Sequence, residues 1–439
     1  MSEPDKLVEI APVPSYSKMS LFRTWLGIGM LSFGGPAAQI ALMHKVIVEQ
    51  RRWLKESQYL NALSFCMLLP GPEAMQLATY AGWRTHGVLG GLIAGLCFVL
   101  PGALIILLLA MTYVLYGTQS VTVILFMGIK AAVLVIVLDA LIKVSKRALI
   151  KRHHKQTAVL SFIALFVFAV PFPLVVLLAG IYGWVKGQAA STHNADVTLP
   201  DGHLVSTLRT VGIWLLIWWL PIGLLWIVSD DQMLMSLALF FSKLAVVSFG
   251  GAYAVLAYMA QDVVTHYQWL SAPQMMDALG LAETTPGPLI LVTQFVGFLA
   301  GFSHAGMAYA VLAACLTLWV TFVPCFLWIF AGAPYMQWLS GQPRLQGALS
   351  NITAAVVGVI ANLSLWFALH VLFDQVSLME LGPAQIWSPQ WASFNLPTVG
   401  FVALAAVLLF GLKQSVITTI VVCAAVVLLV SALGLPMGV

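Results

Sequence analysis

The sequence predicts an all-α polytopic membrane protein made of two homologous halves. Of its 439 residues, 61% are hydrophobic and only 8% are charged, whereas soluble domains carry about 25% charged residues. Many windows exceed the roughly 18 apolar residues that indicate a membrane-spanning helix. Long apolar runs containing proline and glycine are typical of helices rather than of the alternating strands of a membrane barrel. We expect about ten crossings and two re-entrant hairpins.

The two halves are visible as a duplication at a constant offset of 216 residues. Ser32-Phe33-Gly34-Gly35 recurs as Ser248-Phe249-Gly250-Gly251, and Pro70-Gly71-Pro72 recurs as Pro286-Gly287-Pro288. From 32 to 72, 16 of 41 positions are identical to their copies without a gap. The prediction divides the chain into a mobile N-terminal lead-in (1–19), a first transmembrane half (20–185), a polar linker (186–205) and a second transmembrane half (206–439).

The distribution of basic residues predicts that the halves are inverted relative to each other. Segment 44–55 holds Lys45, Arg51, Arg52 and Lys55, while its copy, 260–271, holds neither lysine nor arginine. Cytoplasmic loops of membrane proteins are enriched in these residues. Equivalent loops of the two halves should therefore lie on opposite sides of the membrane.

The same rule predicts a re-entrant hairpin at the first Pro-Gly-Pro motif. A second basic loop, 143–155, should also be cytoplasmic, and an even number of crossings must separate it from 44–55. The intervening apolar segments are three, 58–83, 88–116 and 120–142, so we expect 58–83 to enter the membrane, break and return. Its copy, 274–303, should enter from the other face. Further crossings are expected near 20–47, 156–188, 206–229, 232–262, 304–333, 346–373, 395–412 and 415–437.

An alternative keeps the inversion but changes the number of crossings. In it, segment 20–47 turns back at Ser-Phe-Gly-Gly and segment 156–188 crosses twice at Pro171-Phe172-Pro173, which moves the N-terminus to the cytoplasmic side. The weakly charged N-terminus favours neither arrangement.

The Pro-Gly-Pro motifs have the chemistry of an anion site. Broken backbone in the membrane is tolerated only where it is buried in protein or lines a wet cavity. Pro72 suits the first turn of a helix, because its missing N–H would be unpaired there, and Gly71 permits a sharp turn. The helices beginning at Pro72 and Pro288 would then point their positive N-terminal ends into the membrane from opposite sides. This is the pattern of a transporter site near the midplane.

The Ser-Phe-Gly-Gly motifs supply a second pair of breaks. Ser32 and Ser248 offer hydroxyl groups, and the glycines after them can expose backbone N–H groups. Close helix packing through small residues explains the glycines equally well. The candidate substrate-binding residues from both kinds of motif and their flanks are Ser32, Gly34, Gly35, Gln39, Pro70, Gly71, Pro72, Gln76, Lys243, Ser248, Gly250, Gly251, Thr285, Pro286, Gly287 and Pro288.

Ionisable residues inside apolar segments are costly and often functional. Glu73 directly follows the first Pro-Gly-Pro, and Glu283 precedes the second, so both are candidates for proton coupling or gating. The alternative for Glu73 is that it stabilises the start of its helix through the helix dipole. Lys243, five residues before Ser248, is expected to be the buried cation of the second half, with snorkelling to an interface as the alternative. Gln39, Gln76 and Gln294 suit an oxyanion or hydrogen bonds between helices.

The remaining features argue against an enzyme, a nucleic-acid-binding protein and an ATP-driven pump. The five cysteines lie in apolar segments without metal-ligand spacing. The sequence has no Walker A motif, no GxGxxG and no nucleophile elbow. We expect no cofactor and no metal.

These motifs resemble the chromate ion transporter family in its long, two-domain form. The stretches that carry the resemblance are SFGGPAAQIALMH, RRWL, LLPGPEAMQLATYAGW, FVLPG, SFGGAYAVLAYMAQDVV and ETTPGPLILVTQFVGF. The family's functional positions fall on the glycines and prolines named above and on Pro36, Gln39 and Trp53. The second half has Ala252 and Val255 in place of Pro36 and Gln39, which favours one asymmetric site over two equivalent ones.

The resemblance implies a transporter that exports chromate across the bacterial cytoplasmic membrane and confers chromate resistance. Its implied driving force is the membrane potential or the proton gradient, with sulfate as an exchange partner. The implied partners are chromate, sulfate, protons, the lipid bilayer and a second copy of the chain in a homodimer. The alternatives are a carrier of sulfate or another oxyanion and a passive anion channel.

Overall fold

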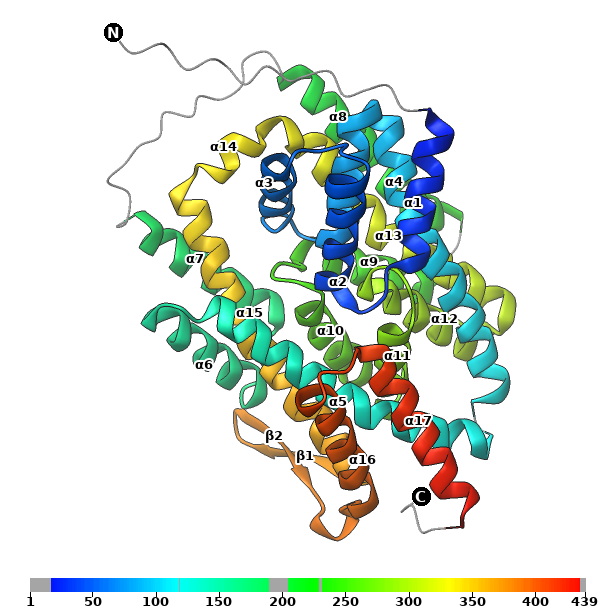
Figure 1. Cartoon of the computed structure of the whole chain (residues 1–439). Helices are drawn as coiled ribbons and strands as arrows, with labels where there is room; N and C mark the ends of the chain where they lie inside the picture. The colour runs from blue at the N-terminus through cyan, green and yellow to red at the C-terminus, as the bar shows by residue number, and fades with distance from the viewer. Residues whose placement is uncertain (1–16, 118, 189–203, 229–230, 435–439) are drawn as a thin grey trace.

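The computed structural model describes residues 17–117, 119–188, 204–228 and 231–434. In the described residues of the first half, the regular secondary structure is entirely helical (Figure 1). It contains α1 (Lys18–Leu31), α2 (Gly35–His44), η1 (Lys45–Gln50), α3 (Glu56–Cys66), α4 (Glu73–Tyr116), α5 (Ser120–Ala148), α6 (Arg152–Phe166) and α7 (Phe172–Gln188).

The second half repeats this order after an additional helix, α8, and it also adds the short α14 before α15 and a strand pair after α15. It contains α8 (Leu204–Val228), α9 (Gln232–Val247), α10 (Ala252–Gln261), η2 (Asp262–His266), α11 (Ala272–Thr284), η3 (Leu289–Leu291), α12 (Val292–Ala305), α13 (Met307–Gly332), η4 (Ala333–Tyr335), α14 (Met336–Ser340), α15 (Pro343–Leu372), β1 (Val376–Leu381), β2 (Ala384–Pro389), η5 (Trp391–Ser393), α16 (Leu396–Ala406), η6 (Val407–Gly411) and α17 (Val416–Ala432).

Five helices in the described part of the chain are long and apolar enough to cross a membrane. They are α4, α5, α8, the run from α13 through α14, and α15. Five shorter apolar segments, centred on α7, α9, α12, α16 and α17, add to these. The structure is therefore that of a polytopic helical membrane protein, as the composition predicts. The number of crossings stays a prediction.

Helix α4 is bent back on itself, which separates the Pro-Gly-Pro arm from the long helix that follows. His86 and Gly87 leave the helical conformation, and Gly87 has a φ of +62°. Gly82 lies directly against Gly90, although eight residues of straight helix would hold them about 12 Å apart. Gly306, with a φ of +79°, makes the corresponding turn between α12 and α13. The turn at Gly87 thus separates the sequence segments 58–83 and 88–116, which were expected to be separate apolar segments.

The halves are interlocked through their long helices (Figure 1). The long helix α5 of the first half packs against α16 and α17 of the second, and α15 of the second half packs against α6 and α7 of the first. The two long helices also pack against each other. Small residues allow these close approaches: Gly128 meets Ala424, and Gly183 meets Gly347.

The structure differs from the sequence prediction in four places. The chain is not purely α, because β1 and β2 form an antiparallel hairpin, with Val376 paired to Pro389. Segments 20–47 and 232–262 are divided at Ser-Phe-Gly-Gly, into α1 and α2 and into α9 and α10, and segment 156–188 is divided into α6 and α7. The divisions of 20–47 and 156–188 occur where the alternative places its turns. The expected lead-in and linker lie almost entirely outside the described residues.

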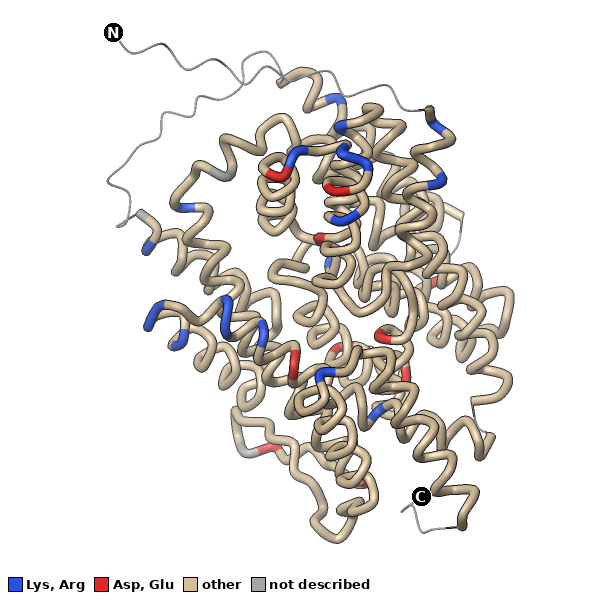
Figure 2. Tube along the Cα trace, viewed as in Figure 1, with Lys and Arg blue, Asp and Glu red and all other residues tan. Residues whose placement is uncertain are grey.

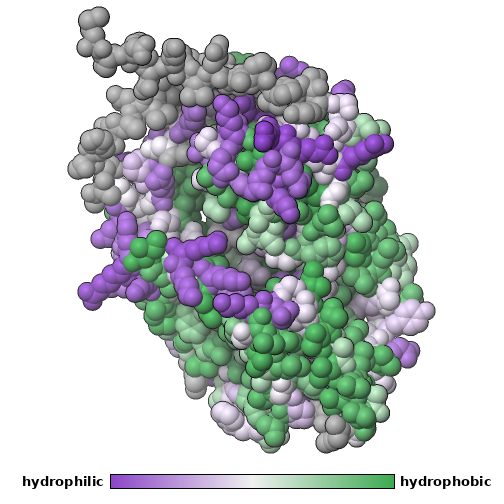
Figure 3. Space-filling model, in the orientation of Figure 1, coloured by the Kyte–Doolittle hydropathy of each residue, from purple (hydrophilic) through white to green (hydrophobic). Residues whose placement is uncertain are grey.

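Basic residues gather on one part of the molecule. Figure 2 shows lysine and arginine concentrated around the loop between η1 and α3 and around the start of α6, whereas the strand hairpin carries none. Figure 3 shows the corresponding hydrophilic patches on either side of a hollow. Because cytoplasmic loops are enriched in lysine and arginine, this asymmetry indicates that the basic part of the molecule faces the cytoplasm.

Candidate functional site

The four helix breaks of the two halves meet in one place. The backbone N–H of Gly71 donates a hydrogen bond to the carbonyl of Ser248 (3.2 Å), and the N–H of Gly287 donates one to the carbonyl of Ser32 (2.8 Å). The two donor glycines are 216 residues apart, and so are the two acceptor serines. The same bond is therefore made twice, each time from one half to the other. Each Pro-Gly-Pro loop is therefore held by the Ser-Phe-Gly-Gly turn of the other half.

Glycine is required at these breaks by conformation and by space. Gly71 has a φ of +120°, and a Cβ there would lie 2.7 Å from Gln76 Nε2. Gly250 has a φ of +84°, and a Cβ there would lie 2.6 Å from Val356 on α15. Residues with a side chain rarely adopt such φ values. Gly34, Gly35, Gly251 and Gly287 also have positive φ.

Four helical segments begin at these breaks. Helices α2, α4 and α10 and the short η3 follow Gly34, Pro72, Gly251 and Pro288, and none of these four described residues makes a side-chain capping bond. Helix N-termini carry partial positive charge and unpaired N–H groups. The arrangement is thus suited to binding an anion.

Two carboxylates lie among these helix starts. A Cβ on Gly251 would be 4.0 Å from Glu73 Oε1, which places this carboxylate beside the N-terminus of α10. Glu283 is 4% exposed and accepts a hydrogen bond from the Tyr253 hydroxyl (3.0 Å). The same hydroxyl lies 3.9 Å from the position of a Cβ on Gly35, at the start of α2. The acids predicted for coupling or gating are therefore brought to the centre.

The last turns of α5 carry charged residues. Asp139 forms an ion pair with Lys143 on the same helix, and Arg147 is exposed at the end of the helix. A cavity of about 280 Å³ next to the first Pro-Gly-Pro loop is lined by Ser64, Met67, Leu68, Gln346, Leu349, Ser350 and Thr353.

The predicted glutamines brace the loops in this structure. Gln39 Nε2 donates to the carbonyl of Gly287 (2.6 Å) and more weakly to that of Ser32 (3.3 Å). Gln76 Nε2 donates to the carbonyl of Pro70 (2.6 Å). Both side chains are almost fully buried, as is Gln294 on α12. Bracing is the structural alternative that the sequence left open for these residues.

The predicted hydroxyl groups are directed at their own backbone. Ser32 donates to Ile28 O (2.6 Å), Ser248 to Ala245 O (2.9 Å) and Thr285 to Ala282 O (3.3 Å). Each hydroxyl has one proton to donate, so in this conformation none of the three offers a donor to a bound anion. Among the predicted residues, the donors that remain for an anion at this centre are backbone N–H groups and the second N–H of the Gln76 amide.

Lys243 is not buried, and the expectation of a buried cation there is wrong. Its side chain is exposed on α9, with its ammonium 5.6 Å from the ring centre of Tyr258. The buried face of α9 contains Leu237, Phe241 and Leu244, whereas Leu239 and Val246 are exposed. Lys243 lies on the exposed stripe of α9 with Leu239 and Val246, and because these two neighbours are apolar they did not mark this stripe as exposed in the sequence.

A buried polar cluster that was not predicted from the sequence joins the halves. Lys130 Nζ on α5 lies 2.9 Å from Asp277 Oδ1 on α11, and the Tyr113 hydroxyl donates to Asp277 Oδ2 (2.7 Å). The Asp277 side chain is 8% exposed and that of Lys130 is 20% exposed. The signal in the sequence was an aspartate nine residues before Pro286 inside an apolar segment, but nothing local indicated its partner.

Comparisons with known proteins give a family match and several relatives. A family model described as "Chromate transporter" matches residues 19–184 and 235–429. The chain is 29% identical to a "Probable chromate transport protein" of Synechococcus elongatus, with 82% of this chain and 87% of that protein covered. It is also 29% identical to proteins named "Chromate transport protein" from Cupriavidus metallidurans (82% and 85% covered) and Pseudomonas aeruginosa (86% and 87%). No solved structure matches the chain.

Proposed function

Because this chain belongs to the chromate transporter family, we propose that it is a secondary active transporter that exports chromate across the bacterial cytoplasmic membrane and so confers chromate resistance. The relatives named as chromate transport proteins support the substrate. The observation that carries the location of the site is the reciprocal pair of hydrogen bonds from Gly71 to Ser248 and from Gly287 to Ser32. The comparisons indicate a transport protein rather than an enzyme.

The binding site in this proposal lies between the starts of α2, α4, α10 and η3. Chromate is a tetrahedral dianion, and backbone N–H groups at helix N-termini bind such anions without a dedicated cation. The candidate residues are those of the four breaks, with Gln39 and Gln76 holding the loops in place. Lys243 is exposed and is not part of this proposed site.

The inverted repeat remains our interpretation of how the two halves are related. Three features support it: the exchanged hydrogen bonds, the common order of breaks in each half, and the reciprocal packing of α5 and α15 on the terminal helices of the other half. Transporters with inverted repeats place their sites at the repeat interface and alternate access by rocking one part against another. We propose that breaking one of the two loop bonds opens the centre to one side while the other bond keeps the opposite side closed.

The membrane potential is a sufficient driving force for export. Each charge contributes about 2.3 kcal/mol per 100 mV, so a dianion leaving an inside-negative cell gains about 4.6 kcal/mol per 100 mV. Glu73 adds a route to proton coupling, because its carboxylate lies beside the α10 N-terminus where the substrate would bind. Binding of a dianion beside Glu73 is repulsive unless that carboxylate takes up a proton or moves away.

Sulfate is the exchange partner that the site geometry favours. Sulfate and chromate are tetrahedral dianions of similar size, and backbone N–H groups respond to charge and shape rather than to the central atom. The same reasoning keeps carriage of sulfate or another oxyanion as the second candidate function.

Chromate uptake into everted membrane vesicles tests the proposal. We expect saturable uptake that sulfate inhibits, that preloaded sulfate accelerates, and that falls when the potential is collapsed. Vesicles from cells without the protein are the control. Uptake that never saturates and shows no trans-stimulation would indicate a passive channel. Sulfate flux without chromate flux would replace chromate as the substrate.

A further inference from the structure

A long apolar groove lies on the outside of the first half, away from the helix breaks. It has a volume of about 830 Å³ and runs between α6 and α7. Both helices rest on α15: His154 Nε2 lies 3.1 Å from Ser350 Oγ, Thr157 donates to Asn351 Oδ1 (3.3 Å), and Gly183 lies against Gly347. The groove is therefore a fixed feature of the fold, with α15 behind it.

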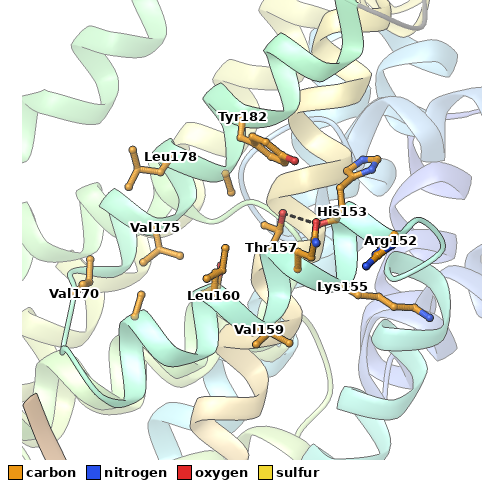
Figure 4. Close-up of a pocket in the computed structure, with 14 residues that line it drawn as sticks. Arg152, His153, Lys155, Thr157, Val159, Leu160, Val170, Val175, Leu178 and Tyr182 are labelled. Carbon is orange, nitrogen blue, oxygen red and sulfur yellow. Dashed lines mark hydrogen bonds between the residues drawn. The ribbon is translucent and has the colours of Figure 1, made fainter.

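The groove is apolar along its length and basic at one end. Figure 4 shows Arg152, His153 and Lys155 at that end and Val170 and Val175 at the other. No aspartate or glutamate occurs among the described residues that line it. Lys151 and Lys186 add positive charge at the basic end, since both line a neighbouring cavity together with His153. The apolar lining consists of Val159, Leu160, Ala164, Val170, Val175, Leu178 and Ala179.

The dimensions match one leaflet of a bilayer. From Arg152 to Ala164 the α6 helix rises about 18 Å, and one leaflet of the hydrocarbon core is about 15 Å thick. Leu160 is 66% exposed and Leu178 is 56% exposed. The basic start of α6 would therefore face the anionic headgroup of a lipid, and the exposed apolar side chains that follow it would face the acyl chains.

We propose that this groove binds an anionic phospholipid, with an acyl chain between α6 and α7 and the phosphate at Arg152, His153 and Lys155. The basic end would lie at the cytoplasmic leaflet, where basic clusters attract anionic lipids. A free oxyanion would need only the charged end and leaves the apolar length unexplained. The binding is separate from the proposed transport site, because none of the residues lining the groove belongs to the helix breaks.

The groove is also connected to the proposed transport site through α15. The α15 helix behind it carries Val356, which contacts the second Ser-Phe-Gly-Gly turn at Gly250. A lipid that fixes α6 and α7 on α15 would stabilise that turn. We therefore expect anionic lipid to stabilise the folded protein and to support transport.

Purified full-length protein in nanodiscs tests the proposal, with phosphatidylglycerol compared with phosphatidylcholine. We expect the wild type to retain phosphatidylglycerol selectively in native mass spectra and to unfold at a higher temperature with it. Each basic side chain near a membrane contributes about fivefold in affinity, so Arg152→Gln with Lys155→Gln should weaken retention by about 25-fold. Lys45→Gln with Arg51→Gln, which removes two exposed charges elsewhere, is the matched control and should retain the lipid.

A second variant tests the apolar part without changing charge. Leu160→Trp should fill the groove and displace the acyl chain while leaving the protein folded, because this side chain is mostly exposed. Equal retention of both lipids by the wild type, or unchanged selectivity in the Arg152 and Lys155 variant, would overturn the proposal. Full displacement of the lipid by inorganic phosphate would indicate a free-anion site instead. A change from dimer to monomer on Leu160→Trp would identify the groove as a contact between copies.

Discussion

Replacing Asp277 by asparagine removes the counter-charge of Lys130 inside the protein, and we expect a large loss of stability. The two groups are 2.9 Å apart, with the Asp277 side chain 8% exposed and that of Lys130 20% exposed. Removing one partner of a buried ion pair costs about 3–5 kcal/mol. Because Lys130 is partly exposed, we expect a loss at the lower end of this range, about 3 kcal/mol. This loss corresponds to roughly a hundredfold change in the folding equilibrium.

The double variant separates the ion pair from other effects of substitution. Lys130→Met with Asp277→Asn removes both charges, and the asparagine can still accept from the Tyr113 hydroxyl. We expect the double variant to be more stable than the sum of the single effects by at least about 2 kcal/mol. The measurement is unfolding in mild detergent with increasing denaturant, followed by tryptophan fluorescence.

The pair formed by Asp139 and Lys143 is the matched control. It is also an ion pair of α5, but the Lys143 side chain is 68% exposed. Its coupling energy should stay below about 0.5 kcal/mol. An equally small coupling for Lys130 and Asp277 would refute the view that a buried ion pair joins the two halves.

Three further outcomes are expected from the site. Gly71→Leu and Gly287→Leu should each abolish transport at normal expression, because both glycines have positive φ and neighbours within 3 Å of a Cβ. The control is Gly27→Leu, which should transport normally because a Cβ there meets nothing within 4 Å. Near-normal transport by both loop variants would show that the loops are not part of the site. Glu73→Gln should make uptake in vesicles insensitive to the pH gradient but not to the potential, and retained sensitivity would exclude Glu73 from coupling. Lys243→Ala should change the KM for chromate by less than about twofold because the side chain is exposed; a larger rise would return it to the site.

Local chemistry accounts for what the sequence predicted of the fold. The breaks at Gly34 and Gly71 were visible because glycine and proline cannot continue a helix without cost. The membrane class followed from hydropathy alone. The exposure of Lys243 was not predicted, because its neighbours on the exposed stripe, Leu239 and Val246, are as apolar as the residues of the buried face.

Contacts between the halves could not be predicted from one sequence. Nothing near Gly71 indicates that its N–H bonds to Ser248 rather than within its own half. The same is true of Lys130 and Asp277, which are close only because α5 and α11 pack together. The β1–β2 hairpin was missed because its strands are short and lie in a segment expected to be a loop.

The location of bound chromate tests the central claim most directly. Chromium scatters X-rays anomalously, so a crystal of the protein grown with chromate would reveal the ion by its own signal. We predict a peak between the starts of α2, α4, α10 and η3, within hydrogen-bonding distance of backbone N–H groups at Gly35 or Gly251. A peak confined to the basic face near Arg152, with none at the helix breaks, would contradict the account.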